Sequence, residues 1–139
     1  MADITIPPAT VVPSANATLV HGRKAASAIV AGQTVYILVD GRIAPADANG
    51  AAPLFNIAGL AANSASAGQP CSYITDDPAL DLGPTTPAIA AGDTLIASAT
   101  PGGVAPDADC ASGWYKTILG IGIGSNKVAF KLLPAGVVK

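Results

Sequence analysis

His21 is the only histidine of the chain, and a serine-type hydrolase needs an imidazole base beside its nucleophile. The residues Gly22 and Arg23 follow it, and a Gly-x-Ser-x-Gly nucleophile elbow is missing from the sequence. We therefore expect His21 to face solvent or to have a structural role, and we expect the chain not to be an enzyme.

The densest group of carboxylates is Asp76, Asp77 and Asp81, which in principle suits a calcium ion. Their spacing matches no EF-hand loop, and all nine acids of the chain are Asp, so the bidentate Glu of that loop is missing. Asp-Asp-Pro is common turn chemistry, which predicts a solvated turn here. Asp107 and Asp109 have the same interpretation, and we expect no metal and no cofactor.

The two cysteines, Cys71 and Cys110, stand far from His21 in sequence, so the ligands for a zinc site are too few. A chain of 139 residues does not need a disulfide to hold its core, and nothing else in it is typical of a secreted protein. We favour two reduced structural thiols, with one disulfide bridge as the alternative.

The run from Gly120 to Gly124, Gly-Ile-Gly-Ile-Gly, has a superficial likeness to a phosphate-binding loop. It lacks the full dinucleotide fingerprint, a following Lys-Ser/Thr and an amphipathic helix, so it predicts a strand whose glycines allow close backbone packing. Trp114 and Tyr115 are the only adjacent aromatic residues. Such a pair can anchor a partner, and a plain core role fits it equally well.

The composition favours strands and turns as the elements that position these residues. The chain has no Glu, 15 Gly and 12 Pro, so strong helix formers are scarce and turn formers are common. Half of the residues are hydrophobic but only 4% are aromatic, so the core must consist of Ala, Val, Ile and Leu. We predict an all-β fold, a small β-barrel or β-sandwich.

The charges limit the possible partners. Seven dispersed basic residues and a net charge of -2 give no basic footprint for nucleic acid. The start of the chain resembles no signal peptide, and no apolar run has the length of a membrane-spanning helix. Charged residues make up only 12% of the chain, about half the usual share, which indicates that a partner covers much of the surface.

Residues 1–20 are predicted to form an extended arm, because prolines interrupt this segment and its apolar residues stand apart. The apolar residues of such an arm can fill pockets on a partner while the backbone adds a strand to an exposed sheet edge. A frayed tail is the alternative. The residues of the arm that we expect to bind a partner are Ile4, Ile6, Pro7, Pro8, Val11 and Val12.

Residues 21–139 are predicted to form a single β-domain, in which strand-length apolar runs alternate with turn residues. In the last run Val128, Phe130 and Leu132 share one face, and lysines share the other, which predicts a strand with one face in water. The other runs begin at residues 34, 54, 71, 94 and 117. Asp40-Gly41 is a strong hairpin signal between two of them.

An internal repeat relates residues 29–61 to residues 89–122. Three blocks recur in the same order with an offset of 60 or 61 residues, which predicts two similar halves within one barrel or sandwich. The matching blocks are Ala31-Gly-Gln-Thr-Val with Ala91-Gly-Asp-Thr-Leu, Gly41-Arg-Ile-Ala-Pro with Gly102-Gly-Val-Ala-Pro, and Ile57-Ala-Gly with Ile118-Leu-Gly.

The order of these blocks resembles that of the small cement, or head decoration, proteins of tailed bacteriophages. The resemblance covers about residues 28–133 and consists of turns and small residues rather than catalytic groups. It is carried by Val30-Ala-Gly-Gln-Thr-Val, Asp40-Gly-Arg-Ile-Ala-Pro-Ala-Asp-Ala, Ile57-Ala-Gly-Leu-Ala-Ala-Asn-Ser-Ala-Ser-Ala-Gly-Gln, Gly92-Asp-Thr-Leu, Gly102-Gly-Val-Ala-Pro and Ile118-Leu-Gly-Ile-Gly.

The resemblance implies a structural protein, made in the cytoplasm of a bacterial host, that binds the outside of an expanded capsid. Its partner would be the major capsid protein, and it would act as a homo-oligomer, with a trimer favoured. The arm and the low charge agree with this function independently of the resemblance. The alternative is a receptor- or carbohydrate-binding β-module displayed on a virion, which would require an exposed aromatic platform.

Overall fold

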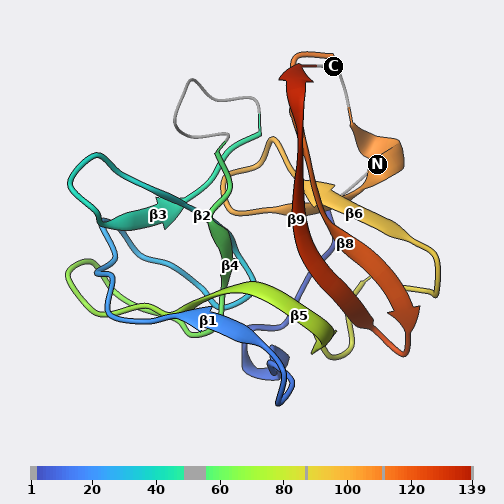
Figure 1. Cartoon of the computed structure of the whole chain (residues 1–139), viewed down its shortest axis with the longest axis horizontal. Coiled ribbons are helices and arrows are strands. Elements are labelled where there is room, and N and C mark those ends of the chain that lie inside the picture. Colours follow the sequence, from blue (N-terminus) through green and yellow to red (C-terminus); the bar gives the residue numbers. More distant parts are fainter. Residues whose placement is uncertain (1–2, 49–55, 87, 111, 139) are drawn as a thin grey trace.

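The computed structural model describes residues 3–48, 56–86, 88–110 and 112–138 (Figure 1). Within them the chain forms strands and two short 3-10 turns, η1 (Pro8–Thr10) and η2 (Asp107–Asp109), and no α-helix. The strands are β1 (Thr18–Val20), β2 (Thr34–Ile37), β3 (Ile43–Pro45), β4 (Gly59–Ala61), β5 (Tyr73–Asp81), β6 (Thr94–Ala97), β7 (Val104–Pro106), β8 (Tyr115–Gly124) and β9 (Lys127–Val138).

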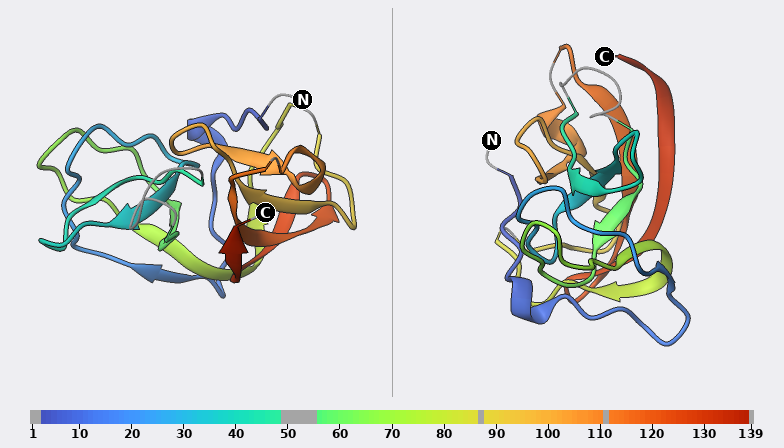
Figure 2. Two further views of the ribbon diagram at one scale, coloured as in Figure 1. Left: turned by 90° about the horizontal axis from the view of Figure 1, so that it is seen from above. Right: turned by 90° about the vertical axis from the view of Figure 1, so that its left-hand side faces the viewer.

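All of these strands pair antiparallel in one sheet, which curls into a half-barrel (Figure 2). The order across the sheet is β3-β2-β4-β5-β9-β8-β6-β7, and β1 pairs with β5 outside this path. The predicted all-β class is therefore confirmed. Leu54 and Phe55, which begin one of the expected strands, lie outside the described residues, and the strand in that region begins at Gly59.

The two halves of the sheet repeat the same pairing. In the first half β3 pairs with β2, β2 with β4 and β4 with β5, and in the second half β7, β6, β8 and β9 pair in the same way. The registers also correspond: Tyr36 faces Ala44 as Ile96 faces Ala105, at offsets of 60 and 61 residues. The sequence repeat is thus a structural repeat, and we call the halves module 1 and module 2.

Gly59 and Gly120 occupy equivalent positions in the two modules, and the packing around them explains why both are glycine. Each residue lies where a Cβ atom would run into a backbone carbonyl oxygen of the neighbouring strand, that of Ile74 for Gly59 and that of Ala129 for Gly120. Only glycine has no Cβ, so the strands can approach this closely at equivalent points of both modules.

Strand β5 belongs to both modules. Its first residues pair with β4 on one edge and with β1 on the other, so that Tyr73 faces both Ala61 and Val20. In module 2 the equivalent strand is β9, where Val128 faces both Gly122 and Leu80 of β5. The second half of β5 therefore occupies in module 2 the place that β1 occupies in module 1.

The core consists mainly of Ala, Val, Ile and Leu side chains, as the composition predicts. A central cluster joins the two modules and includes Leu60, Leu80, Leu95 and Phe130. A second cluster lies within module 1, and a small third cluster lies within module 2. Cys71 and Cys110 are buried in these two smaller clusters and are free thiols, as favoured from the sequence.

The N-terminal segment packs on its own chain, and the expectation of an arm with free apolar residues is corrected here. Ile4 and Val11 are buried in the central cluster. Backbone hydrogen bonds fix the segment: Ile4 N donates to Val104 O at 2.8 Å, and Val12 N donates to Asp81 O at 2.8 Å. Its apolar side chains thus complete the core of a chain in which only 4% of the residues are aromatic.

The prediction of a solvated turn at the Asp76 cluster was wrong, because these residues lie within strand β5. Asp77 is fully buried, and its carboxylate accepts hydrogen bonds from Ser14 N at 2.8 Å, from the Ser14 hydroxyl and from Ala79 N at 3.0 Å. Asp77 therefore anchors the N-terminal segment to the sheet, a role that local turn propensity does not show.

Candidate binding surfaces

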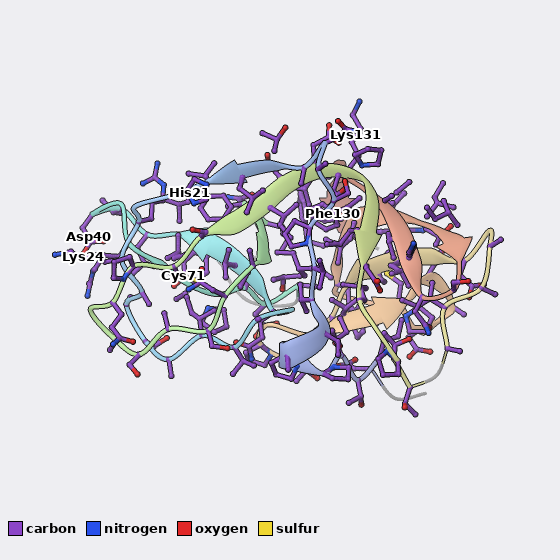
Figure 3. All side chains as sticks on the ribbon, turned by 90° about the horizontal axis from the view of Figure 1, so that it is seen from below. His21, Lys24, Asp40, Cys71, Phe130 and Lys131 are labelled. Carbon is purple, nitrogen blue, oxygen red and sulfur yellow. The ribbon has the colours of Figure 1, made fainter. Side chains whose placement is uncertain are left out.

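The described residues give no support for a metal site. No three of their His, Cys and Asp side chains lie close enough together to hold a metal ion. His21 is exposed, as expected, and its Nδ1 lies 2.6 Å from the hydroxyl oxygen of Ser72 at the surface. Figure 3 shows His21 near one end of the molecule, on the same side as Lys24 and Asp40. Within the described part of the chain, no helix has the length and apolar character needed to cross a membrane.

The predicted arm residues divide into two groups. Ile4 and Val11 are buried, so in this conformation they cannot fill pockets on a partner. Ile6 and Pro7 are half-buried, and Ile6 packs against the central cluster. Only Pro8 and Val12 are exposed, Val12 with 55% of its surface accessible. Of the six predicted contact residues, these two are thus the exposed ones.

Trp114 and Tyr115 are both half-buried. The Trp114 side chain packs against the central cluster and against the small cluster of module 2, so most of its apolar surface serves the core. Tyr115 begins β8, and its backbone N donates to Ala48 O at 2.6 Å, which ties β8 to module 1. The described structure does not bring the aromatic pair together with Val12.

The main exposed apolar feature lies on β8. In this strand the small residues face the core and the large apolar residues face outward, which is the inverse of the usual arrangement. The small residues Gly120 and Gly122 face the interior, and the large residues Ile121 and Ile123 face outward with 49% and 48% of their surface accessible. Ile121 faces Ala129 of the adjacent strand β9. Grouped apolar side chains at the surface of a strand are typical of an interaction site.

Lysines and aspartates lie beside these isoleucines, and each lysine faces an aspartate on the neighbouring strand. On β9, next to Ala129, the exposed Lys127 and Lys131 face Asp81 and Asp76 of β5 in the strand register. The outer surface of β5, β9 and β8 is therefore an apolar stripe beside a row of lysines and aspartates. We call the surface formed by Ile121, Ile123, Lys127, Ala129 and Lys131 the β8–β9 face.

A second exposed apolar feature is the tip of the β2–β3 hairpin. Val39 is fully exposed there, and Leu38 and Tyr36 beside it are half-buried. Gly41 has a φ of +89°, as the Asp-Gly signal predicted for a tight turn. The backbone N–H and guanidinium of Arg42 donate to the Asp40 carboxylate, and these bonds hold the pKa of Asp40 below its usual value.

A hollow of about 320 Å³ lies on module 2 beside η2 and the start of β6. Its lining is apolar at Ile89 and Leu95 and acidic at Asp93 and Asp107. The Lys116 ammonium lies 2.5 Å from the Asp107 carboxylate, and the hydrogen bond to this carboxylate raises the pKa of Lys116 above its usual value.

Sequence reasoning missed the β8–β9 face because it assigned the Gly-Ile-Gly-Ile-Gly run to backbone packing alone. That assignment is correct for Gly120 and Gly122, whose Cβ positions are occupied by the backbone oxygens of Ala129 and Ala90. The missed signal is the alternation itself: if the glycines face inward, the isoleucines must face outward.

Comparison with known proteins adds no assignment: no protein-family model and no curated protein matches this chain.

Proposed function

We propose that this protein is a structural cement protein that binds the outside of an expanded bacteriophage capsid and clamps neighbouring major capsid protein subunits. The observation that carries the proposal is the inverted β8 strand, because outward isoleucines over inward glycines indicate a surface that a partner covers. The resemblance of the repeated blocks to head decoration proteins supports the same function, and the protein acts without catalysis, metal or cofactor.

The chemistry of the β8–β9 face suits a protein partner better than a glycan. Glycan sites of surface modules are built on exposed aromatic platforms, whereas this face carries Ile121, Ile123 and Ala129. Burying two half-exposed isoleucines contributes about 2 kcal/mol per copy, and the lysines and aspartates beside them fix the orientation. Many copies on one shell then provide the stabilisation that a single contact does not.

The mechanism is linkage between binding and shell stability. A protein that binds only the expanded shell lowers the free energy of that state and opposes the loss of subunits. The exposed residues Pro8 and Val12 of the N-terminal segment and the half-buried Trp114 and Tyr115 are proposed as peripheral contacts. The bound form is a homo-oligomer, with a trimer favoured, on the virion exterior.

The test is a co-sedimentation experiment with undecorated expanded capsids and with unexpanded precursor shells. Saturable binding to the expanded form alone, in a ratio set by icosahedral symmetry, is the expected result. The double variant Ile121→Asp/Ile123→Asp should bind about 30-fold more weakly, which corresponds to the loss of about 2 kcal/mol. Ala67→Asp is the matched control, because it places the same charge on an exposed apolar residue that belongs to neither proposed surface.

Two outcomes contradict the proposal. If the wild-type protein sediments with neither shell, the cement function is wrong and the receptor- or glycan-binding module becomes the better hypothesis. If the wild-type protein binds and the double variant binds equally well, the β8–β9 face is not the contact surface.

A further inference from the structure

Within the chain, the β6–β7 hairpin of module 2 packs on the surface of module 1. The internal repeat predicts a second contact of this kind, between the β2–β3 hairpin of module 1 and the surface of module 2. The tip of the β6–β7 hairpin, residues 98–103, packs on module 1. Thr34 N donates to Gly102 O at 3.0 Å, Gly102 N donates to Ala46 O at 2.7 Å, and the Gln33 side chain lies against Gly102. The surface of module 1 that receives this hairpin, residues 30–34 with Ala46, is called platform 1.

The equivalent hairpin of module 1 has no such neighbour among the described residues. The β2–β3 tip, residues 38–42, corresponds to residues 98–103 through the offsets of 60 and 61 residues that relate the strand registers. Val39 at this tip is fully exposed. Figure 3 places Asp40 of the same tip at one end of the long dimension of the molecule, away from module 2.

The platform that would receive this hairpin is present on module 2. The residues equivalent to platform 1 are 90–94 with Asp107, and we call them platform 2. They border the hollow of about 320 Å³ already described, whose lining also includes Ile89, Leu95 and Ala108. Because the β2–β3 tip lies at one end of the molecule, away from module 2, it can reach platform 2 of a second copy of the chain (Figure 3).

The differences between the two hairpins match the differences between the two platforms. Platform 2 has Asp93 and Asp107 where platform 1 has Gln33 and Ala46, so it has gained two carboxylates. The β2–β3 tip has Arg42 where the β6–β7 tip has Gly103. The Arg23 guanidinium also lies at this tip, where it donates to Gly41 O at 2.9 Å. Asp40 is paired with Arg42 at the tip, and Lys116 is paired with Asp107 at the platform, so Arg23 leaves the hairpin positive and Asp93 leaves the platform acidic.

We infer that the β2–β3 hairpin of one copy docks into the module 2 hollow of a second copy, at the site equivalent to the one where the β6–β7 hairpin packs within the chain. Gly41 N already donates to Leu38 O and Gly41 O already accepts from Arg23, so side chains rather than the backbone of the tip make this contact. Val39 enters the apolar part of the hollow, and Arg42 approaches Asp93 and Asp107. The contact is head-to-tail, so each chain offers one hairpin and one platform, and the assembly closes into a ring or grows as a filament. The inference does not depend on the proposed capsid function.

Sedimentation velocity of the full chain over a range of concentrations tests the inference. The expected species has a mass that is a multiple of the 13.5 kDa chain mass. The variants Val39→Asp in the hairpin and Ala108→Arg at the hollow should each reduce the mass to that of one chain. Both side chains are exposed, so circular dichroism should show that both variants remain folded. Ile123→Asp is the matched control and should retain the assembly.

Mixing the two variants separates this contact from any symmetric one. Val39→Asp chains keep an intact platform, and Ala108→Arg chains keep an intact hairpin, so the mixture should form a species of two chains and no larger. A wild-type chain that stays monomeric at all concentrations, or a mixture that stays monomeric, overturns the inference. Loss of assembly in Ile123→Asp with retention in Val39→Asp also overturns it, and assigns the contact to the β8–β9 face.

Discussion

Asp77 is the residue on which the attachment of the N-terminal segment depends most. Its buried carboxylate accepts hydrogen bonds from the backbone N–H and the hydroxyl of Ser14, so removing it leaves two half-buried donors without this partner. We expect Asp77→Ala to lower the free energy of unfolding by about 2–3 kcal/mol, measured by urea denaturation. The neighbouring exposed residue offers the control: Asp76→Ala should change it by less than about 0.5 kcal/mol. Equal effects of the two substitutions would contradict this role.

Cys71 gives the protein a specific response to alkaline pH. Burial raises the pKa of this thiol above the ordinary value of 9.0, and its Sγ donates to Asn63 O at 3.2 Å. Because the native pKa exceeds the unfolded one, the contribution of the thiol is complete below the unfolded pKa and is lost as the pH rises through the native pKa. Urea midpoints should therefore fall above pH 9 in the wild type, and fall less steeply in Cys71→Ala. Parallel curves for the two proteins would refute this assignment.

Among the strand residues, Gly59 and Gly120 tolerate a larger side chain least, because neighbouring backbone lies against them. Gly59→Ala and Gly120→Ala should each destabilise the fold by about 3 kcal/mol, because the new methyl group meets a backbone oxygen that cannot move without shifting a strand. Gly92→Ala is the control: its φ is +91° but the space around it is open, so about 1 kcal/mol is expected. Thermal unfolding monitored by circular dichroism checks this order. If Gly92→Ala proves as harmful as the other two, backbone strain rather than close packing is responsible.

The N-terminal segment contributes to the core as an element, although its prolines suggested a free arm. Ile4→Ala should lower the free energy of unfolding by about 3 kcal/mol, because Ile4 is part of the central cluster. Val12→Ala, at an exposed position of the same segment, should change it by less than about 0.5 kcal/mol. Chemical denaturation of both variants decides between a core element and an arm. A negligible effect of Ile4→Ala would restore the free arm.

The sequence predicted best those features that depend on local chemistry. The alternation at Val128 and Phe130, the turn at Gly41 and the three repeated blocks all follow from periodicity or turn residues, and the structure confirms them. The features it missed depend on distant partners. The burial of Ile4 requires Val104, and the strand conformation at Asp77 requires Ser14, which lies 63 residues away. The β8–β9 face was missed because it requires knowing which side of the strand faces the core.

At the scale of the whole molecule, capsid binding and self-association are proposed for different surfaces. The β8–β9 face is proposed for the capsid, while the β2–β3 tip and the hollow are proposed for a second copy. Strand β5 belongs to both modules, so both surfaces are parts of a single sheet. The two surfaces should nevertheless be separable by substitution, because their exposed residues lie on different strands.

Linkage makes the last prediction quantitative. If the protein binds only the expanded shell, each tenfold increase of free protein above its dissociation constant adds about 1.4 kcal/mol of stabilisation per site. The calorimetric melting temperature of expanded shells should therefore rise steadily with the logarithm of the protein concentration. With Ile121→Asp/Ile123→Asp the same rise should begin at about 30-fold higher concentration, because the slope depends on the number of sites and only the onset depends on affinity. A melting temperature that does not change with wild-type concentration would contradict stabilisation by binding, even if the protein were found on the shell.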